Sequence, residues 1–181
     1  MSNPDALVPD RSCGTCTLCC KVMGVRELNK PAGTWCTHCD PRRGCGIYET
    51  RPAGCREFFC TWRIEASIPE WFRPLTSKLV LAVEQQGRRL AIHVDPGTPQ
   101  AWRQEPYYRQ LKVWAQEAVA TNRQVIVRLG KRMIAVLPDC DVDVGVVGED
   151  ETVVTAARQT PRGLAYTAYR AKVADLLGGG T

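Results

Sequence analysis

Apolar and polar residues alternate along two pairs of segments in the second half of the chain. The first pair, 79–83 and 90–94, flanks a turn at 85–87; the second, 125–129 and 134–136, flanks Gly130-Lys131. Alternation with a period of two around turn-forming residues predicts β-hairpins. Two further strands are expected on either side of Gly148-Glu149-Asp150, at 142–146 and 152–155. His93 alternates with Ile92 and Val94 and so belongs to the opposite face of its strand.

Two other segments show helical spacing. Between Pro99 and Ala120, four residues fall on one helical face: Tyr107, Leu111, Trp114 and Ala118. A last helix is expected after Thr160-Pro161, a cap and first-turn pair, with one face formed by Tyr166, Tyr169, Val173 and Leu176. The second part of the chain is therefore predicted to be an antiparallel sheet with two helices, an α+β arrangement.

Cysteine distribution separates this part from the first one. Nine of the ten cysteines lie between Cys13 and Cys60, and only Cys140 lies beyond them. The cysteine-rich stretch is full of turn formers and has no long periodic segment, as expected where metal replaces a large apolar core. We therefore predict a metal-stabilised module at 1–70 and an α+β domain at 71–181, with Trp71 and Phe72 packing the two together.

The spacing of the nine cysteines indicates metal ligation. Two-residue gaps let successive thiolates turn onto one ion, and all-sulfur sites suit zinc or iron. The candidate ligands are Cys13, Cys16, Cys19, Cys20, Cys36, Cys39, Cys45, Cys55 and Cys60. His38, between Cys36 and Cys39, is expected to point away from an ion held by its neighbours.

A disulfide framework is the main alternative, because short cysteine-dense segments are common in secreted proteins. Three features oppose it: no apolar signal-peptide core at the start, an odd number of clustered cysteines, and two-residue spacings that favour a shared ion. No stretch approaches the roughly 20 apolar residues of a membrane span. We therefore expect a cytoplasmic protein with reduced thiols and no membrane contact.

Cys19 and Cys20 bear on the number of centres. Adjacent side chains diverge and rarely share one tetrahedral ion, so this pair favours two centres or one polynuclear centre. The number of cysteines is compatible with two mononuclear zinc or iron sites and with one or two Fe–S clusters. Among the basic residues nearby, Arg51 is the strongest candidate to donate hydrogen bonds to ligating thiolates.

The 181 residues carry 24 Lys and Arg against 19 Asp and Glu, a formal charge of +5. No basic stripe or recognition motif accompanies this charge, so we expect metal ions as partners and no nucleic acid. The protein partner is left open by the sequence, as is whether the chain is an enzyme, since the residues outside the cysteines place no nucleophile, general base or substrate pocket.

Two blocks of sequence resemble a known family. Cys13-Gly-Thr-Cys-Thr-Leu-Cys-Cys20, followed by Cys45-Gly-Ile-Tyr-Glu-Thr-Arg-Pro-Ala-Gly-Cys55-Arg-Glu-Phe58, is similar to the CxxCxxCC, or YkgJ-like, cysteine-cluster family. The resemblance covers residues 13 to about 62 and implies a zinc- or iron-chelating domain with about eight cysteines. Trp35-Cys36 resembles the family's intermediate cysteine, whereas Cys39 is additional to the usual set. The expected function is metal binding, with an Fe–S redox or catalytic protein and a zinc-stabilised adaptor for a protein or nucleic acid as alternatives.

Overall fold

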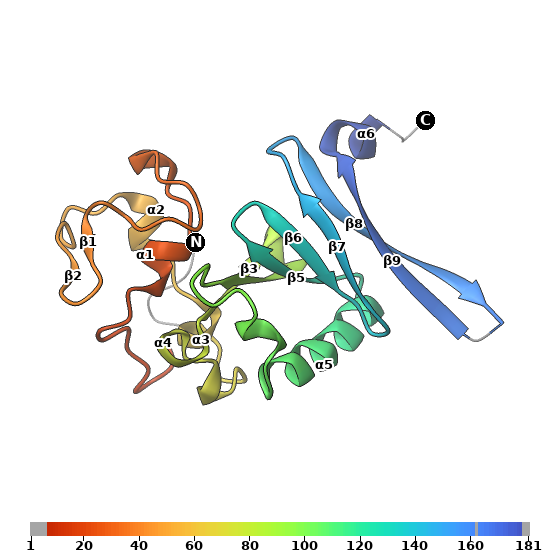
Figure 1. Ribbon diagram of the computed structural model, residues 1–181, viewed down its shortest axis with the longest axis horizontal. Coiled ribbons are helices and arrows are strands. Elements are labelled where there is room, and N and C mark those ends of the chain that lie inside the picture. The colour runs from red at the N-terminus through yellow and green to blue at the C-terminus, as the bar shows by residue number, and fades with distance from the viewer. Residues whose placement is uncertain (1–6, 162, 179–181) are drawn as a thin grey trace.

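A five-stranded sheet forms the centre of the molecule in the computed structural model, which describes residues 7–161 and 163–178 (Figure 1). Its order is β3-β4-β5-β6-β7. The strands are β3 (Leu79–Glu84), β4 (Arg89–Val94), β5 (Gln124–Leu129), β6 (Arg132–Val136) and β7 (Asp141–Val146). The predicted α+β class is confirmed, and the four strands expected from the two hairpins are present.

The sheet is mixed, where the sequence predicted an antiparallel one. Strands β4 and β5 run parallel, and the other neighbouring pairs are antiparallel. The reason is the helix between them, α5 (Tyr107–Ala120), because a helical crossover returns the chain to the edge from which the first strand started. The two predicted hairpins are thus joined side by side through a parallel pair.

Helix α5 covers one face of the sheet. Its buried residues Leu111, Ala115 and Ala118 belong to one core with Leu81, Ile92 and Val127 of the strands. The predicted apolar face is confirmed, although the helix starts at Tyr107; the preceding residues form a short 3₁₀ turn, Ala101–Arg103. Phe72 is fully buried in this core, stacked on Trp71 at 4.5 Å and Trp114 at 5.0 Å between ring centroids.

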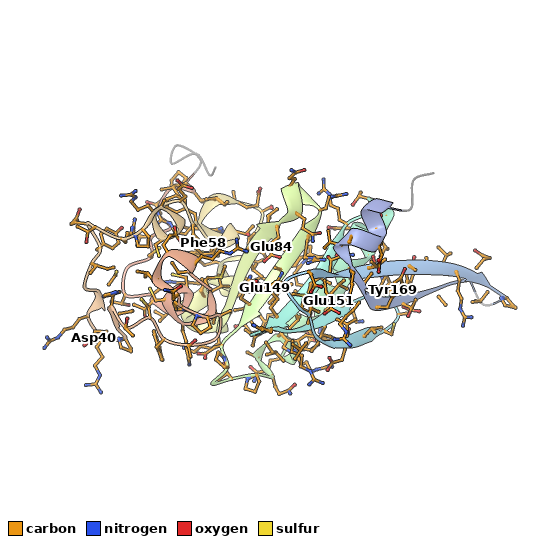
Figure 2. All side chains as sticks on the ribbon, turned by 90° about the horizontal axis from the view of Figure 1, so that it is seen from above. Asp40, Phe58, Glu84, Glu149, Glu151 and Tyr169 are labelled. Atoms are coloured by element: carbon orange, nitrogen blue, oxygen red, sulfur yellow. The ribbon has the colours of Figure 1, made fainter. Side chains whose placement is uncertain are left out.

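The other face of the sheet is covered by two separate units. At β3, Leu18 and Val22 of α1 (Leu18–Val22) pack on Val80. At β5 and β6, a second cluster contains residues of the ribbon formed by β8 (Glu151–Thr160) and β9 (Gly163–Lys172). Figure 2 shows Glu84 between Phe58 of the N-terminal region and Glu151 of the ribbon.

A polar strip lies on this face between the two units. Alternation places Glu84 on the same face as Ala82, and His93 on the same face as Ala91, so two small residues leave room for long side chains. Glu84 accepts a bond of 2.7 Å from Nη2 of Arg128, and its other oxygen lies 3.3 Å from Nε2 of His93. His93 is thus a buried histidine beside a carboxylate.

The predicted last helix is wrong for most of its length. Residues 163–172 form β9, paired along its whole length with β8, and only α6 (Val173–Gly178) is helical. Tyr166 and Ala168 contact the second core cluster, as a period of two requires. Thr160 and Pro161, expected as a helix cap, instead lead into the hairpin turn before Gly163, whose φ of 108° suits glycine.

The N-terminal region contains only short elements. They are α1, β1 (Cys39–Asp40), β2 (Gly44–Cys45), α2 (Ala53–Arg56) and α3 (Thr61–Ile64); the short helix α4 (Pro74–Ser77) then leads into β3. The region is tied to the sheet by an ion pair of 2.5 Å between Lys21 and Asp95. None of the helices in the described part of the chain is long and apolar enough to span a membrane.

Candidate metal centre

The nine predicted ligands all lie in these short N-terminal elements and the turns between them. Cys13 and Cys16 flank a tight turn in which the Cys16 amide donates to the Cys13 carbonyl at 2.8 Å. Cys19 and Cys20 follow in α1, whose Leu18 and Val22 face the sheet. Because Leu18 and Val22 are one helical turn apart, the two cysteines between them are directed to other sides of the helix.

The later cysteines are brought back to α1 by backbone hydrogen bonds. The Cys36 amide donates to the Cys20 carbonyl at 3.0 Å, and the Cys39 amide donates to the Cys36 carbonyl at 3.1 Å. Cys39 and Cys45 are then direct partners in the β1–β2 hairpin. A stretch distant in sequence is therefore folded against Cys20.

The last two cysteines begin or belong to short helices. Cys55 lies in α2, and Cys60 caps the N-terminal end of α3. Cys60 and Cys16 pack beside the cluster that joins α1 to β3. All ten cysteines of the chain lie in the described residues and none forms a disulfide.

Electrostatic influence divides the thiols into two sets. Burial, with contributions from Cys13 and Cys16 and against the lowering effect of Arg63, raises the pKa of Cys60 to about 11. Burial likewise raises the pKa of Cys16, with Cys13 adding to the shift. Cys13, Cys16 and Cys60 thus form one neighbourhood, and Cys19 joins it because Cys16 and Cys13 both contribute to raising its pKa.

The second set surrounds Cys20. Burial and the neighbouring thiols Cys20, Cys45 and Cys36 together raise the pKa of Cys39 to about 12. Burial also raises the pKa of Cys55, with contributions from the same three thiols. The second neighbourhood therefore consists of Cys20, Cys36, Cys39, Cys45 and Cys55.

Cys19 and Cys20 connect the two sets. Their side-chain hydrogen bond raises the pKa of Cys19 and lowers the pKa of Cys20, so Cys20 is the more readily ionised member. Cys39, Lys30 and Arg51 also lower the pKa of Cys20. Arg51, selected from the sequence, thus acts on this thiol, and its guanidinium lies 3.9 Å from the Tyr48 ring centroid.

Lys30 is a buried cation that sequence reasoning missed. Only 8% of it is exposed, and Nζ donates to the carbonyls of Met23, Pro31 and Lys21. Burial lowers its pKa, whereas nearby thiolates of both sets raise it. The sequence Asn29-Lys30-Pro31 predicts only a turn. In the structure, the antiparallel bridge between Val25 and Lys30 places the Lys30 side chain near the cysteines.

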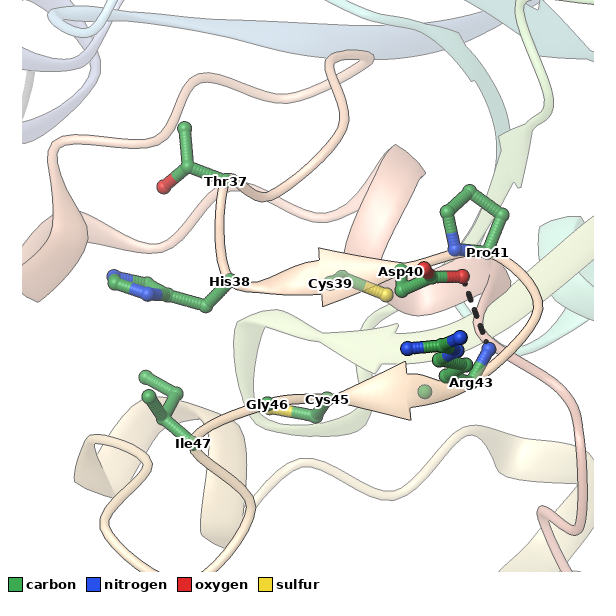
Figure 3. A pocket seen from close by; sticks show the side chains of 10 residues that line it. Thr37, His38, Cys39, Asp40, Pro41, Arg43, Cys45, Gly46 and Ile47 are labelled. Carbon is green, nitrogen blue, oxygen red and sulfur yellow. Dashed lines mark hydrogen bonds between the residues drawn. The ribbon is translucent and has the colours of Figure 1, made fainter.

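A shallow hollow lies over the β1–β2 hairpin and is lined by Cys39, Cys45 and His38 among others (Figure 3). The figure shows the His38 ring directed away from Cys39. Cys140 lies elsewhere, beside the second core cluster, where its Sγ is 3.7 Å from the Tyr166 carbonyl oxygen. It belongs to neither thiol set.

The thiols are near one another without forming a finished chelate. Within the described residues, no three Cys, His, Asp or Glu side chains are arranged so that they would hold a metal ion. The donor set nevertheless fits a soft or borderline cation, since thiols that suppress one another's ionisation become thiolates when a divalent ion replaces their protons. The resemblance to the cysteine-cluster family stays a prediction that depends on the two sequence blocks.

No family model, no curated protein and no solved structure matches this chain.

Proposed function

We propose that this is a metal-binding protein that holds zinc or iron through its N-terminal cysteines. The observation that carries the proposal is the convergence of nine unpaired thiols from the short N-terminal elements and the turns between them, divided into two sets that meet at Cys19 and Cys20. The first set would supply four ligands, as a closed all-thiolate site requires, and the second would supply four of its five.

The charge of these sites supports the same proposal. Two ions bound by eight thiolates carry a net charge of about −4, taking each ion as divalent. Lys30 and Arg51 lie where they offset part of this charge, and Arg63 donates to Cys13 Sγ at 3.4 Å. Cationic donors around thiolates stabilise the ligated form and tune its electronics.

The ion could be mononuclear zinc or iron, or iron within an Fe–S cluster. A closed zinc site would make the module a structural scaffold, such as the metal-stabilised core of an adaptor. An Fe–S centre would instead give the cysteines a redox role. Anaerobic purification followed by an absorbance spectrum distinguishes them. Broad bands near roughly 400 nm with acid-labile sulfide indicate clusters, and a colourless protein with zinc indicates closed sites.

Three cysteine variants test the two-set arrangement. Cys60→Ser removes a ligand of the first set and Cys55→Ser removes one of the second, so each is expected to reduce bound metal by up to half. Cys140→Ser is the matched control and is expected to leave the metal content unchanged. Equal metal content in all three variants and the parent protein would overturn the proposal.

A further inference from the structure

The β8–β9 ribbon extends beyond the central sheet at the end that carries its turn (Figure 1). Nearer the sheet the ribbon is supported, since Val153 and Ala168 are buried in the second core cluster. Farther out, residues 156–159 of β8 are all exposed. A two-stranded ribbon without a supporting face is marginally stable in water, and it gains stability when another strand pairs with it.

The outer edge of β8 carries the backbone groups of its odd-numbered residues. The Tyr166 amide donates to Oδ2 of Asp139 at 3.3 Å, so the backbone of Tyr166 faces away from β8. Tyr166 is paired with Ala157, which therefore directs its own N–H and C=O away from β9. The Val153 carbonyl, four residues earlier, faces the same way, because it accepts a bond of 3.1 Å from Gln124 Nε2.

The two outer edges of the ribbon differ in what covers them. The β9 edge lies beside β7, and Arg170 donates to the Val146 carbonyl at 2.7 Å. On the β8 edge, the backbone groups of Thr155, Ala157 and Gln159 bond to no residue in the described part of the chain. The outer half of β8 is therefore an unpaired strand edge.

This edge lacks the features that block strand pairing at the edges of the central sheet. In β7, Asp141 and Asp143 add carboxylates, and the pairing with β6 shifts register between Met133 and Ile134. At the other edge, β3 contacts α3 and α4. Residues 155–159 of β8 are Thr-Ala-Ala-Arg-Gln, without proline, lysine or carboxylate, and the two alanines let another strand approach closely.

We infer that this edge pairs with the same edge of a second copy of the chain, around a two-fold axis at Ala157. Antiparallel pairing centred there places Thr155 opposite Gln159 of the copy and forms two backbone bonds in each of three residue pairs, about six in all. Arg158 then lies opposite Ala156 of the copy, so a long side chain meets a small one and no like charges are directly opposed.

The edge is its own complement, which is why the occupant is a second copy. A register centred one residue later would place Arg158 directly opposite Arg158 of the copy, and like charges so placed are destabilising. A two-fold interface uses one patch on both chains, as the pairing around Ala157 does. Because the edge lies outside the cysteine module, its pairing is independent of the proposed metal binding.

Sedimentation velocity of the full chain under reducing conditions, which exclude dimers linked by disulfides, measures the association. We expect a reversible monomer–dimer equilibrium between about 1 µM and 1 mM, the range in which small interfaces dissociate. A chain that stays monomeric over this range would overturn the inference and leave the edge to a different partner.

Ala157→Lys and Ala157→Glu, both at an exposed position, each place two like charges opposite one another at the axis. Each change is expected to weaken the dimer at least about fivefold. Mixed in equal amounts, the two variants should form a heterodimer tighter than either homodimer, because opposite charges then face each other.

Thr167→Lys is the matched control, since Thr167 is an exposed residue of β9 that β8 separates from the unpaired edge. This variant should associate like the parent protein. Ala157 variants that associate like the control, or a mixture that associates no more tightly than the separate variants, would each overturn the inference.

Discussion

The N-terminal region and the central sheet differ in how much apolar surface they bury. The sheet and α5 surround a continuous core whose largest members, Trp102, Phe72 and Leu111, have at most 1% of their surface exposed. The N-terminal region has helices of four or five residues and strands of two. Its cysteine-rich part buries Leu18 and Val22 against Val80, and Trp62 of α3 is buried in the core of the sheet. Elements so short are not stable alone, because nucleating each one costs more than its few bonds return.

The comparison teaches where the stability of each region must come from. A region with nine thiols and a small apolar cluster needs cross-links, and it has no disulfides. The proposed metal–thiolate bonds would supply that need, since the binding free energy of a structural ion is also folding free energy. The sheet needs no such contribution.

The largest expected effect comes from removing the metal. Treatment of the full chain with a strong chelator should unfold residues 13–60 and leave the sheet folded, because structural zinc contributes about 10–16 kcal/mol in small zinc domains. Amide hydrogen exchange is the measurement. Protection factors in 13–60 should fall by at least about 100-fold, while those in β3 to β6 change little.

Readdition of the metal controls for chemical damage and should restore protection. A uniform loss of protection, or none in either region, would contradict the division between the two regions.

A smaller effect is expected from one substitution made in each region. Phe72→Ala removes a fully buried ring stacked on Trp71 and Trp114, and should reduce the free energy of unfolding of the sheet by about 3–5 kcal/mol. Phe59→Ala, the matched change at a half-buried ring in the N-terminal region, should cost about 1 kcal/mol. Denaturant unfolding followed by circular dichroism measures both. Equal costs would show that the N-terminal region also depends on apolar packing.

The smallest predicted effect is the acid sensitivity of the polar strip. Burial raises the pKa of Glu84, but the contacts with His93 and the charge of Arg128 outweigh burial and bring it to about 2, below the ordinary 4.5. The folded state therefore gains stability that is complete above about pH 5 and is lost as the pH falls toward 2. We expect a loss of about 1–3 kcal/mol across this range, allowing for the partial exposure of the side chain.

In the Glu84→Gln variant, the free energy of unfolding should change less between pH 5 and pH 2 than it does in the parent protein. Glu149→Gln, at an exposed position, is the control and should keep the parent pH dependence. A Glu84→Gln curve that follows the parent curve between pH 5 and 2 would remove Glu84 as the cause.

Much of the sheet was predictable because its inward-facing residues alternate visibly. Leu79 and Leu81 of β3 and Leu90, Ile92 and Val94 of β4 follow a two-residue period, and the helix between the hairpins has its apolar residues one turn apart. The parallel pairing of β4 and β5 was not recognised, although a helix between two neighbouring strands is the usual connection of a parallel pair.

The segment after Thr160 misled the sequence analysis for a physical reason. Tyr166, Tyr169 and Val173 have a spacing that fits a helix, but in β9 Tyr166 faces the core and Tyr169 is 49% exposed on the other side of the ribbon. Ala168 and Arg170 share this inward face with Tyr166. Because one is small and the other is charged, the sequence shows no alternation of large apolar residues that would predict a strand.

The sequence predicted which residues form the candidate site but not how they are arranged. Short spacings such as Cys13-x2-Cys16 were enough to name the nine thiols. Their division into two sets depends on tertiary contacts, for example the hydrogen bond from the Cys36 amide to the Cys20 carbonyl, and no sequence pattern encodes it. Lys30 was missed for the same reason.

The central claim is that the nine N-terminal thiols hold metal, and elemental analysis of the full chain tests it most directly. Protein purified anaerobically without added metal should contain about two ions of zinc or iron per chain, or more iron with matching sulfide if clusters are present. Less than about half an equivalent of zinc and iron together, with intramolecular disulfides detected by mass spectrometry, would contradict the account.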